Sequence, residues 1–363
     1  MLTKKNETSI ISVITDSSTV DGRDNAMQEY IISKMKELID TDSPSGYHYE
    51  AQEYLIKELK KLGYEPYSPK KGGVIVDLGG SGNPVMLLAH IDTLGAFVGN
   101  IKSDGRLAIS NMSLNPNNIE TENVTIITRD RKRYEGTIQL VNASIHVNEE
   151  INRARDFHTL EVVLDEDVHS KKEVEALGIM AGDIVAVQPR FTVTRKGYIK
   201  SRFLDDKASA AILLGLAKYV KEMNQPLKRN VQMYFTVFEE IGHGASYGIG
   251  EEIDDILSVD MGCVGEGLTC KETMVSICAK DSAGPYHFDM VNELIQAAKS
   301  KKLDYAVDVY PRYSSDAQVA MKVGVDARHA LIGPGVYASH GYERTHVNGV
   351  MNTFELIKAY LDV

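Results

Sequence analysis

The sequence lacks the features that mark membrane proteins, disulfide-stabilised secreted proteins and nucleic-acid binders. No apolar run approaches the roughly 18 residues that cross a bilayer. Lys and Arg number 40 against 51 Asp and Glu, so the net charge of -11 argues against binding to a phosphate backbone. The three cysteines, Cys263, Cys270 and Cys278, are too few for a disulfide framework and fit no zinc-binding spacing, so we expect reduced thiols.

Signals for export and for two common enzyme classes are also missing. The N-terminal apolar stretch is short, Ser9, Ser12 and Thr15 interrupt it, and no small-residue cleavage site follows, so we expect a cytoplasmic protein. No glycine-rich phosphate loop follows an expected strand, which argues against nucleotide chemistry. Ser201, Ser209 and Ser314 lack the G-x-S-x-G turn of the serine hydrolases.

Two kinds of segment divide the 363 residues, which are enough for two domains. Residues 1–26 are polar, and we expect a flexible tail there. Helical and strand-like patterns alternate over 27–100 and again over 196–363, whereas 101–195 carries short β-like runs separated by charged turns. The pattern predicts an α/β domain in two parts, interrupted by a small inserted β-rich domain at 101–195.

Chemically active side chains follow the apolar strands of the α/β parts. They are His90, Asp92, the pair Asp205-Asp206, the pair Glu239-Glu240, Asp260 and His346. In open α/β sheets the ligand crevice lies beyond the carboxyl ends of the strands, so these residues could converge. Histidines and carboxylates are the ligands of Zn²⁺, Mn²⁺ and Co²⁺. Adjacent acids such as Glu239 and Glu240 repel each other, so burying both is costly without a cation.

Five short motifs, taken in order, resemble those of the glutamyl and tetrahedral aminopeptidases, which are co-catalytic metallopeptidases of the zinc-exopeptidase fold. The motifs are Ala89-His90-Ile91-Asp92, Phe203-Leu204-Asp205-Asp206-Lys207, Phe238-Glu239-Glu240-Ile241-Gly242, Val259-Asp260 and Ser314-Ser315-Asp316-Ala317. The resemblance covers roughly residues 27–363. It implies a mixed-sheet, three-layer catalytic domain of that fold, with the β-rich domain inserted.

The resemblance also implies two divalent metal ions per chain, with zinc favoured over cobalt or manganese. His90 and Asp260 would hold one ion, and Glu240 and His346 would hold the other. Asp205 would bridge the two ions. In the family this bridging residue often has a cis peptide bond to the residue that follows it.

Two histidines compete for the last ligand position. Family members usually have an aromatic and a small apolar residue before this histidine and a serine after it, whereas the run here is Ser339-His340-Gly341-Tyr342-Glu343-Arg344-Thr345-His346-Val347. We expect His346, because the residues after it lead into the terminal helix as in the family. His340 is the alternative.

The remaining assignments concern catalysis. Asp92 is expected to orient His90 by accepting its other ring N–H, and Glu239 is expected to act as the general base. The resemblance thus implies a dinuclear-metal aminopeptidase that hydrolyses the N-terminal bond of short peptides through a metal-bridging water activated by Glu239. It further implies a homo-oligomer as large as a dodecamer. We expect no nucleic-acid or membrane partner.

Other functions fit the ligand pattern less well. Metal-dependent dipeptidases and N-acyl-amino-acid deacylases share it, but their extra domain lies between the fourth ligand and the last histidine. Here the insert lies between His90 and Asp205, which favours the aminopeptidases. Adjacent Glu239 and Glu240 cannot flank a sugar as a glycosidase requires. A non-catalytic scaffold would have no use for the ligand set, so two bound metal equivalents would oppose it.

Overall fold

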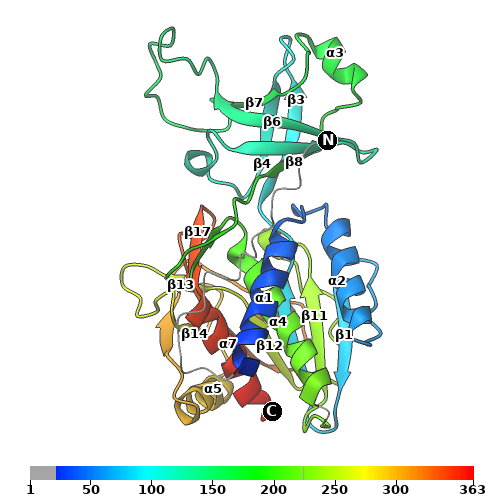
Figure 1. Cartoon of the computed structure of the whole chain (residues 1–363), viewed down its shortest axis with the longest axis vertical. Helices are drawn as coiled ribbons and strands as arrows, with labels where there is room; N and C mark the ends of the chain where they lie inside the picture. Colours follow the sequence, from blue (N-terminus) through cyan, green and yellow to red (C-terminus); the bar gives the residue numbers. More distant parts are fainter. Residues whose placement is uncertain (1–21, 224) are drawn as a thin grey trace.

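Two regions of different architecture make up the computed structural model, which describes residues 22–223 and 225–363. Figure 1 shows a layered α/β region, with a smaller β region joined to it through neighbouring segments of chain. The described part of the chain confirms the predicted α/β class with a separate β-rich unit.

A mixed eleven-stranded sheet organises the α/β region. Its main path runs β1-β11-β2-β12-β16-β17-β10-β9, with β13 and β14 paired to β16 and with β15 paired to β14. The strands are β1 (Val74–Gly79), β2 (Val85–His90), β9 (Thr192–Val193), β10 (Tyr198–Ser201), β11 (Val231–Thr236), β12 (Asp255–Val259), β13 (Gly262–Val264), β14 (Val275–Lys280), β15 (Tyr305–Val309), β16 (Arg328–Tyr337) and β17 (Glu343–His346). Because β11, β2, β12 and β16 are parallel neighbours, their carboxyl ends meet at one edge.

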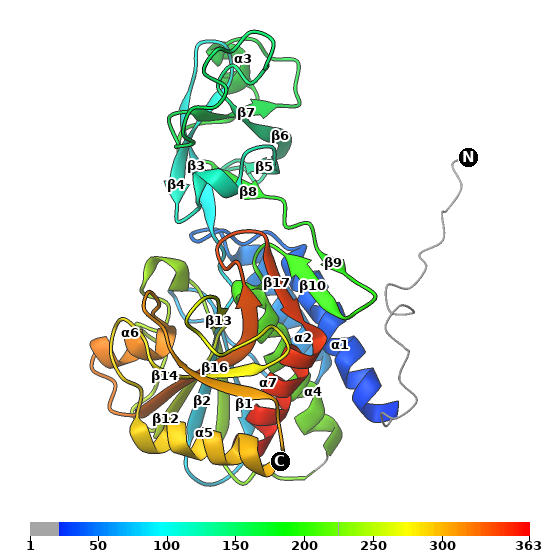
Figure 2. The same cartoon turned by 90° about the vertical axis from the view of Figure 1, so that its left-hand side faces the viewer.

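Helices cover both faces of this sheet (Figure 2). They are α1 (Gly22–Ile39), α2 (Tyr49–Lys61), α4 (Leu204–Met223), α5 (Phe288–Ser300), α6 (Asp316–Lys322) and α7 (Val347–Leu361), together with a short 3-10 helix at Glu239–Ile241. In Figure 2, α6 lies on the opposite side of the sheet from α4 and α7. This arrangement matches the three layers expected.

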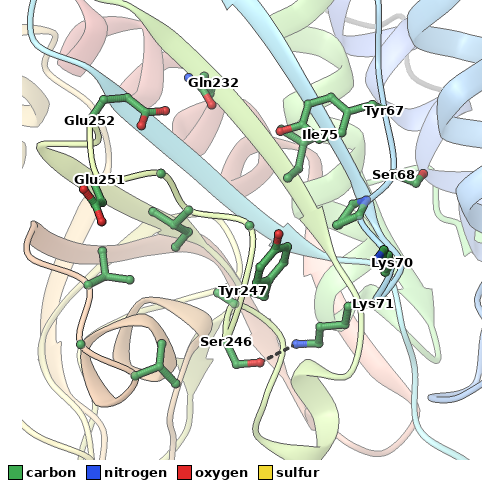
Figure 3. A pocket seen from close by; sticks show the side chains of 18 of the residues that line it. Tyr67, Ser68, Lys70, Lys71, Ile75, Gln232, Ser246, Tyr247, Glu251 and Glu252 are labelled. Carbon is green, nitrogen blue, oxygen red and sulfur yellow. Dashed lines mark hydrogen bonds between the residues drawn. The ribbon is translucent and has the colours of Figure 1, made fainter.

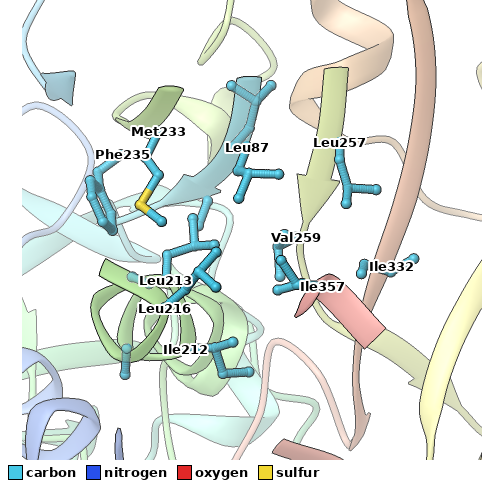
Figure 4. Packing of buried hydrophobic residues seen from close by; sticks show 14 of the residues in the cluster. Leu87, Ile212, Leu213, Leu216, Met233, Phe235, Leu257, Val259, Ile332 and Ile357 are labelled. Atoms are coloured by element: carbon cyan, nitrogen blue, oxygen red, sulfur yellow. The ribbon is translucent and has the colours of Figure 1, made fainter. Parts of the chain in front are cut away.

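Helix α4 is buried almost throughout and forms the centre of the main core (Figure 4). Its Ile212, Leu213 and Leu216 are fully buried and pack with residues of the sheet, among them Leu87 on β2 and Val259 on β12. Each such side chain contributes about 1.5–3 kcal/mol when buried. The core therefore fixes the strand ends that precede the predicted site residues.

The smaller region is a closed barrel with strand order β3-β4-β7-β6-β5-β8. Its strands are β3 (Gly95–Ile101), β4 (Leu107–Met112), β5 (Asn123–Ile127), β6 (Arg133–Leu140), β7 (Leu160–Leu164) and β8 (Ile184–Val187), with a 3-10 turn at Pro116–Asn118 and the short helix α3 (Lys171–Ala176). Along β6 the side chains of Ile138 and Leu140 are buried and their neighbours are half-buried, as alternation predicts. The barrel has a hydrophobic core of its own.

Several observed boundaries differ from those expected. Residues 22–26, expected in the flexible tail, lie in α1, and residues 1–21 are outside the described residues. The barrel begins at Gly95 rather than at residue 101. Strand β16 continues to Tyr337 and pairs there with Arg344 of β17, so residues 338–342 form a tight turn between antiparallel strands. This turn decides where His340 lies.

Two further expectations concern the cysteines and the membrane. The three cysteines form no disulfide in the structure, and Cys270 and Cys278 are buried. None of the described helices combines the length and the apolar character needed to cross a bilayer.

Candidate metal centre

The carboxyl-end edge of the sheet gathers a set of buried or half-buried acids with two histidines. We term this set the histidine–carboxylate cluster, and it comprises His90, Asp205, Glu239, Glu240, Asp260 and His340. His90 ends β2 and Asp260 directly follows β12. The register between these strands pairs Leu88 with Ser258, which places His90 and Asp260 at the same level. The apolar strand interiors thus deliver polar residues to one place.

Asp205 lies between the two histidines of the cluster. Nε2 of His90 is 3.1 Å from one carboxylate oxygen of Asp205, and Nε2 of His340 is 3.5 Å from the other. His340 Nε2 is also 3.5 Å from Glu240, and His90 Nε2 is 3.8 Å from Glu239. The Asp205–Asp206 peptide bond is cis, as the resemblance led us to expect.

Two triplets of possible ligand atoms lie close enough together to hold an ion, and His90 belongs to both. The atoms of His90, Asp205 and Glu240 lie within 4.8 Å of one another, and so do those of His90, Glu239 and Asp260. Glu240 and Glu239 are consecutive, yet they belong to different triplets. The short 3-10 helix after β11 therefore points the two acids at different parts of the cluster.

His346, the histidine preferred from the sequence, lies away from this cluster. Its Nε2 is 2.7 Å from the carbonyl oxygen of Lys196, and its Nδ1 accepts a hydrogen bond from the backbone N–H of Asn348 at 3.0 Å. It caps α7, which begins at the next residue, Val347. Both ring nitrogens are engaged, so the structure does not bring His346 into the cluster, whereas the alternative, His340, lies in it.

Asp92 contacts His90 differently from the expectation. His90 Nδ1 is 2.9 Å from the backbone carbonyl oxygen of Asp92, whereas the carboxylate is 3.7 Å away. The carboxylate instead accepts the backbone N–H of Glu239 at 3.1 Å and the hydroxyl of Ser45. The ring is therefore oriented by a carbonyl, and the Asp92 side chain holds the Glu239 backbone.

A second set of contacts, not predicted from the sequence, steadies the segment after the glutamate pair. Asp316 accepts the backbone N–H of Ala245 at 2.7 Å and the hydroxyl of Thr236. Lys71 donates to the carbonyl of Gly244 and to the Ser246 hydroxyl, the latter at 2.9 Å (Figure 3). The Ser-Ser-Asp-Ala motif contained Asp316, but nothing in the sequence pointed to Lys71.

The cavity drawn in Figure 3, of about 1340 Å³, lies beside this segment. Lys71, Ser246 and Tyr247 are among the residues that line it, and no member of the histidine–carboxylate cluster does so. The candidate centre therefore lies outside this cavity.

The electrostatics of the cluster are unfavourable in the protein alone. Burial raises the pKa of Glu239 and of Glu240 far above the usual range, and neighbouring carboxylates add to the effect. Burial and the charge of Asp205 raise the pKa of Asp260 to about 7. Asp205 is the exception, because His340 and His90 outweigh its burial and hold its pKa well below the usual value.

Comparison with known proteins agrees with this architecture. The family model described as M42 glutamyl aminopeptidase matches residues 72–356. The chain belongs to the M42 glutamyl aminopeptidase family. It is therefore a peptidase, and the aminopeptidase class inferred from the sequence motifs is confirmed.

Relatives of the M42 chain align over nearly its whole length. It is 43% identical over 331 residues to the Bacillus subtilis (strain 168) protein YhfE, which carries a provisional aminopeptidase name, with 90% of this chain and 96% of YhfE covered. It is 24% identical over 340 residues to the lysyl aminopeptidase of Pyrococcus furiosus, with 90% and 96% covered.

Solved structures share the fold at lower identity. An aminopeptidase from Desulfurococcus kamchatkensis, APDkam598, has a TM-score of 0.82 at 24% identity and covers 92% of this chain and 95% of its own. The TET1 peptidase of Pyrococcus horikoshii, which can assemble into a tetrahedron or a large octahedral shell, has a TM-score of 0.82 at 21% identity, with 91% and 98% covered. At these identities the likeness establishes the fold alone.

The M42 family is metal-dependent, and the side chains of the cluster are of the types that bind metal ions. Imidazole nitrogens and carboxylate oxygens suit zinc, cobalt and manganese. Oε1 of Glu240 is buried and, within the described residues, has no hydrogen-bond partner. A buried carboxylate oxygen without a donor is costly, and a cation would satisfy it.

Proposed function

We propose that this M42 aminopeptidase uses two divalent ions, zinc foremost, to hydrolyse the N-terminal peptide bond of short peptides. The observation that carries the proposal is the position of Asp205, with one carboxylate oxygen toward His90 and the other toward His340. A carboxylate placed in this way can serve two ions at once. Among the described residues, no lysine or arginine forms an ion pair with the Asp205 carboxylate.

Each ion would have its own ligands beside the shared one. His90 and Asp260 would hold the first ion, and Glu240 and His340 would hold the second, with Asp205 common to both. When bound, such ions lower the pKa of water and polarise a peptide carbonyl. The proton transfer would be carried out by a residue outside the ligand set.

Glu239 is the residue placed to move the proton. Its carboxylate is mostly buried, lies 3.8 Å from His90 Nε2 and is not needed as a ligand in this assignment. It would accept the proton of the attacking water and pass it to the amine that leaves. The backbone of Glu239 is held by the Asp92 carboxylate, so its side chain starts from a fixed position.

The excess of acids in the cluster also favours an exopeptidase. A free α-ammonium group carries a positive charge that buried carboxylates attract. Acylation of that group removes the charge, so an N-acylated peptide should be a poor substrate. This feature separates the proposal from a deacylase.

The test is to measure metal content and substrate preference together. The purified protein should bind two equivalents of zinc and should cleave aminoacyl-nitroanilides in preference to the same compounds with an N-acetyl group. His340→Ala should lose one zinc equivalent and nearly all activity. His346→Ala is the matched control and should keep both. A protein without bound divalent metal, or one that cleaves only the acylated compounds, would contradict the proposal.

We also propose that the chain self-associates. Support comes from the likeness to the TET1 peptidase, which can assemble into a tetrahedron or a large octahedral shell. Light scattering should give a mass of several subunits, and a strict monomer at micromolar concentration would contradict this part.

A further inference from the structure

Glu343 is a buried acid that contacts two segments of the cluster. It is the first residue of β17 and is 2% exposed. One carboxylate oxygen accepts the backbone N–H of Asp205 at 3.0 Å, and the other accepts the backbone N–H of His340 at 3.0 Å. A single side chain therefore ties together two segments that are far apart in sequence.

Both segments have irregular backbone at these points: Asp205 lies at the start of α4, where its backbone angles are not helical, and His340 lies in a turn. His340 has a left-handed backbone with φ of 63°, within the turn between β16 and β17. Phe203, shortly before Asp205, also has a positive φ, of 65°. For residues other than glycine this conformation costs on the order of 1 kcal/mol. Hydrogen bonds from backbone N–H groups to a carboxylate are strong enough to offset that cost.

The chemistry of the contact requires a carboxylate. Two backbone N–H groups point at Glu343 from different directions, and a carboxylate offers an acceptor oxygen to each. A glutamine of the same shape would offer one oxygen and one NH₂ group, so one N–H would meet a donor. Burying an acid beside Asp205 is unfavourable in itself, which argues that the two bonds are the reason for its presence.

We propose that Glu343 is a positioning residue that sets the separation of the Asp205 carboxylate and the His340 ring, and thereby the affinity of the ion that these two share. This inference rests on the proposed dinuclear function. Glu343 touches the backbone of the ligands and none of their ligand atoms, so it acts only through them.

The discriminating variant is Glu343→Gln, which keeps volume and shape. Zinc binding would be measured by competition with a chromophoric chelator, and the absorption spectrum of the cobalt-loaded protein would report ligand geometry. We expect the unchanged protein to bind two equivalents of zinc. In the variant, one equivalent should bind about 10–100-fold more weakly, with an altered cobalt spectrum, because residues that orient metal ligands have effects of this size.

Arg344→Gln is the matched control. Arg344 is the next residue of β17, and its guanidinium pairs with Glu272 at 3.2 Å and lies over the Tyr198 ring, away from the cluster. It should bind both equivalents as the unchanged protein does. If Glu343→Gln does not fold, Glu343→Asp keeps both acceptor oxygens on a shorter stem and should show the same selective weakening to a smaller degree.

The outcomes separate the two proposals. If the unchanged protein binds no metal, the dinuclear function fails and this inference fails with it. If the unchanged protein binds two equivalents and the Glu343 variants bind both with the same affinity and spectrum, only the positioning role is overturned. An equal loss of zinc affinity in Arg344→Gln would also overturn the positioning role, because substitutions elsewhere in β17 would then weaken zinc binding as much.

Discussion

Two buried acids stand at opposite ends of strand β12 and have opposite surroundings. Asp255 begins the strand and is 1% exposed, while Asp260 directly follows it and is 3% exposed. Arg328 contacts Asp255 with two nitrogens at 2.7 and 2.8 Å, and Arg229 and Tyr360 donate at 2.6 and 2.7 Å. Around Asp260 the neighbouring charges are those of His90 and of the carboxylates of Asp205, Asp206 and Glu239.

The pKa values move in opposite directions at the two ends. Burial alone would raise the pKa of Asp255, but hydrogen bonds from Arg328, Tyr360 and Arg229 lower it below the usual value. The pKa of Asp260 is raised to about 7 by burial and by Asp205. The amino end of the strand thus has two arginines beside one acid, whereas the carboxyl end has two histidines among the four acids of the cluster. A bound metal cation would offset the negative charge of these buried acids.

The largest expected effect is on turnover, at the carboxyl end of the strand. Glu239→Gln keeps the side-chain shape and removes the proton acceptor, so kcat should fall about 10²–10⁴-fold. Both zinc equivalents should remain, because Glu239 is not an assigned ligand. Steady-state assays with aminoacyl-nitroanilides and metal analysis check this. Glu252→Gln, in the separate cavity, is the control, and retained turnover in Glu239→Gln would remove Glu239 from the mechanism.

The next effect is on stability, at the end with its own cations. Asp255→Asn breaks a buried ion-pair network and should lower the free energy of unfolding by about 3 kcal/mol, the low end of the usual range because both arginines keep some solvent contact. Urea unfolding in the presence of a chelator measures it. Asp254→Asn, at an exposed neighbouring position, should change little. Zinc stoichiometry should be the same in both variants, and a loss of zinc in Asp255→Asn would show that the two ends are coupled.

The comparison also explains what the sequence could predict. His90 and Asp260 directly follow or end apolar strands, and the parallel register brings them level, so their meeting was predictable. The choice of the last histidine was not. Strand β17 buries Glu343 and Thr345 and leaves Arg344 and His346 half-buried, an alternation that hydrophobicity does not reveal. Without knowing where β17 runs, one cannot tell from the sequence which of His340 and His346 reaches the cluster.

Other misses have similar physical causes. Strand β3 contains Gly95, Gly99 and Asn100, which weaken a strand pattern, so the start of the barrel was placed too late. The contact between Asp92 and His90 was expected through the carboxylate and is made by the backbone carbonyl, which no side-chain pattern encodes. The fold class could be predicted from the hydrophobic periodicity, whereas the backbone contacts at the site depend on how distant segments pack together.

A smaller effect of the opposite sign is expected at the carboxyl end. In metal-free protein, Asp260→Asn removes one of several repelling charges while keeping an oxygen to accept the Met261 N–H, which is 2.6 Å away. The variant should therefore be more stable than the unchanged protein, by about 1 kcal/mol. Thermal unfolding in chelator checks the sign. Added zinc should stabilise the unchanged protein more than the variant, and a variant that is less stable in chelator would contradict the repulsion argument.

The smallest effect is the pH dependence of the amino-end network. Because the folded pKa of Asp255 lies below its unfolded value of about 3.9, its stabilising contribution is present above that pH and is lost as the pH falls through the folded pKa. The stability difference between the unchanged protein and Asp255→Asn should therefore be constant from pH 7 to pH 5 and should narrow below about pH 4. Urea unfolding of both proteins in chelator at each pH measures it. A difference that persists undiminished at pH 3 would mean that the Asp255 network stabilises the fold through packing rather than charge, and the contrast between the two ends of β12 would lose its electrostatic basis.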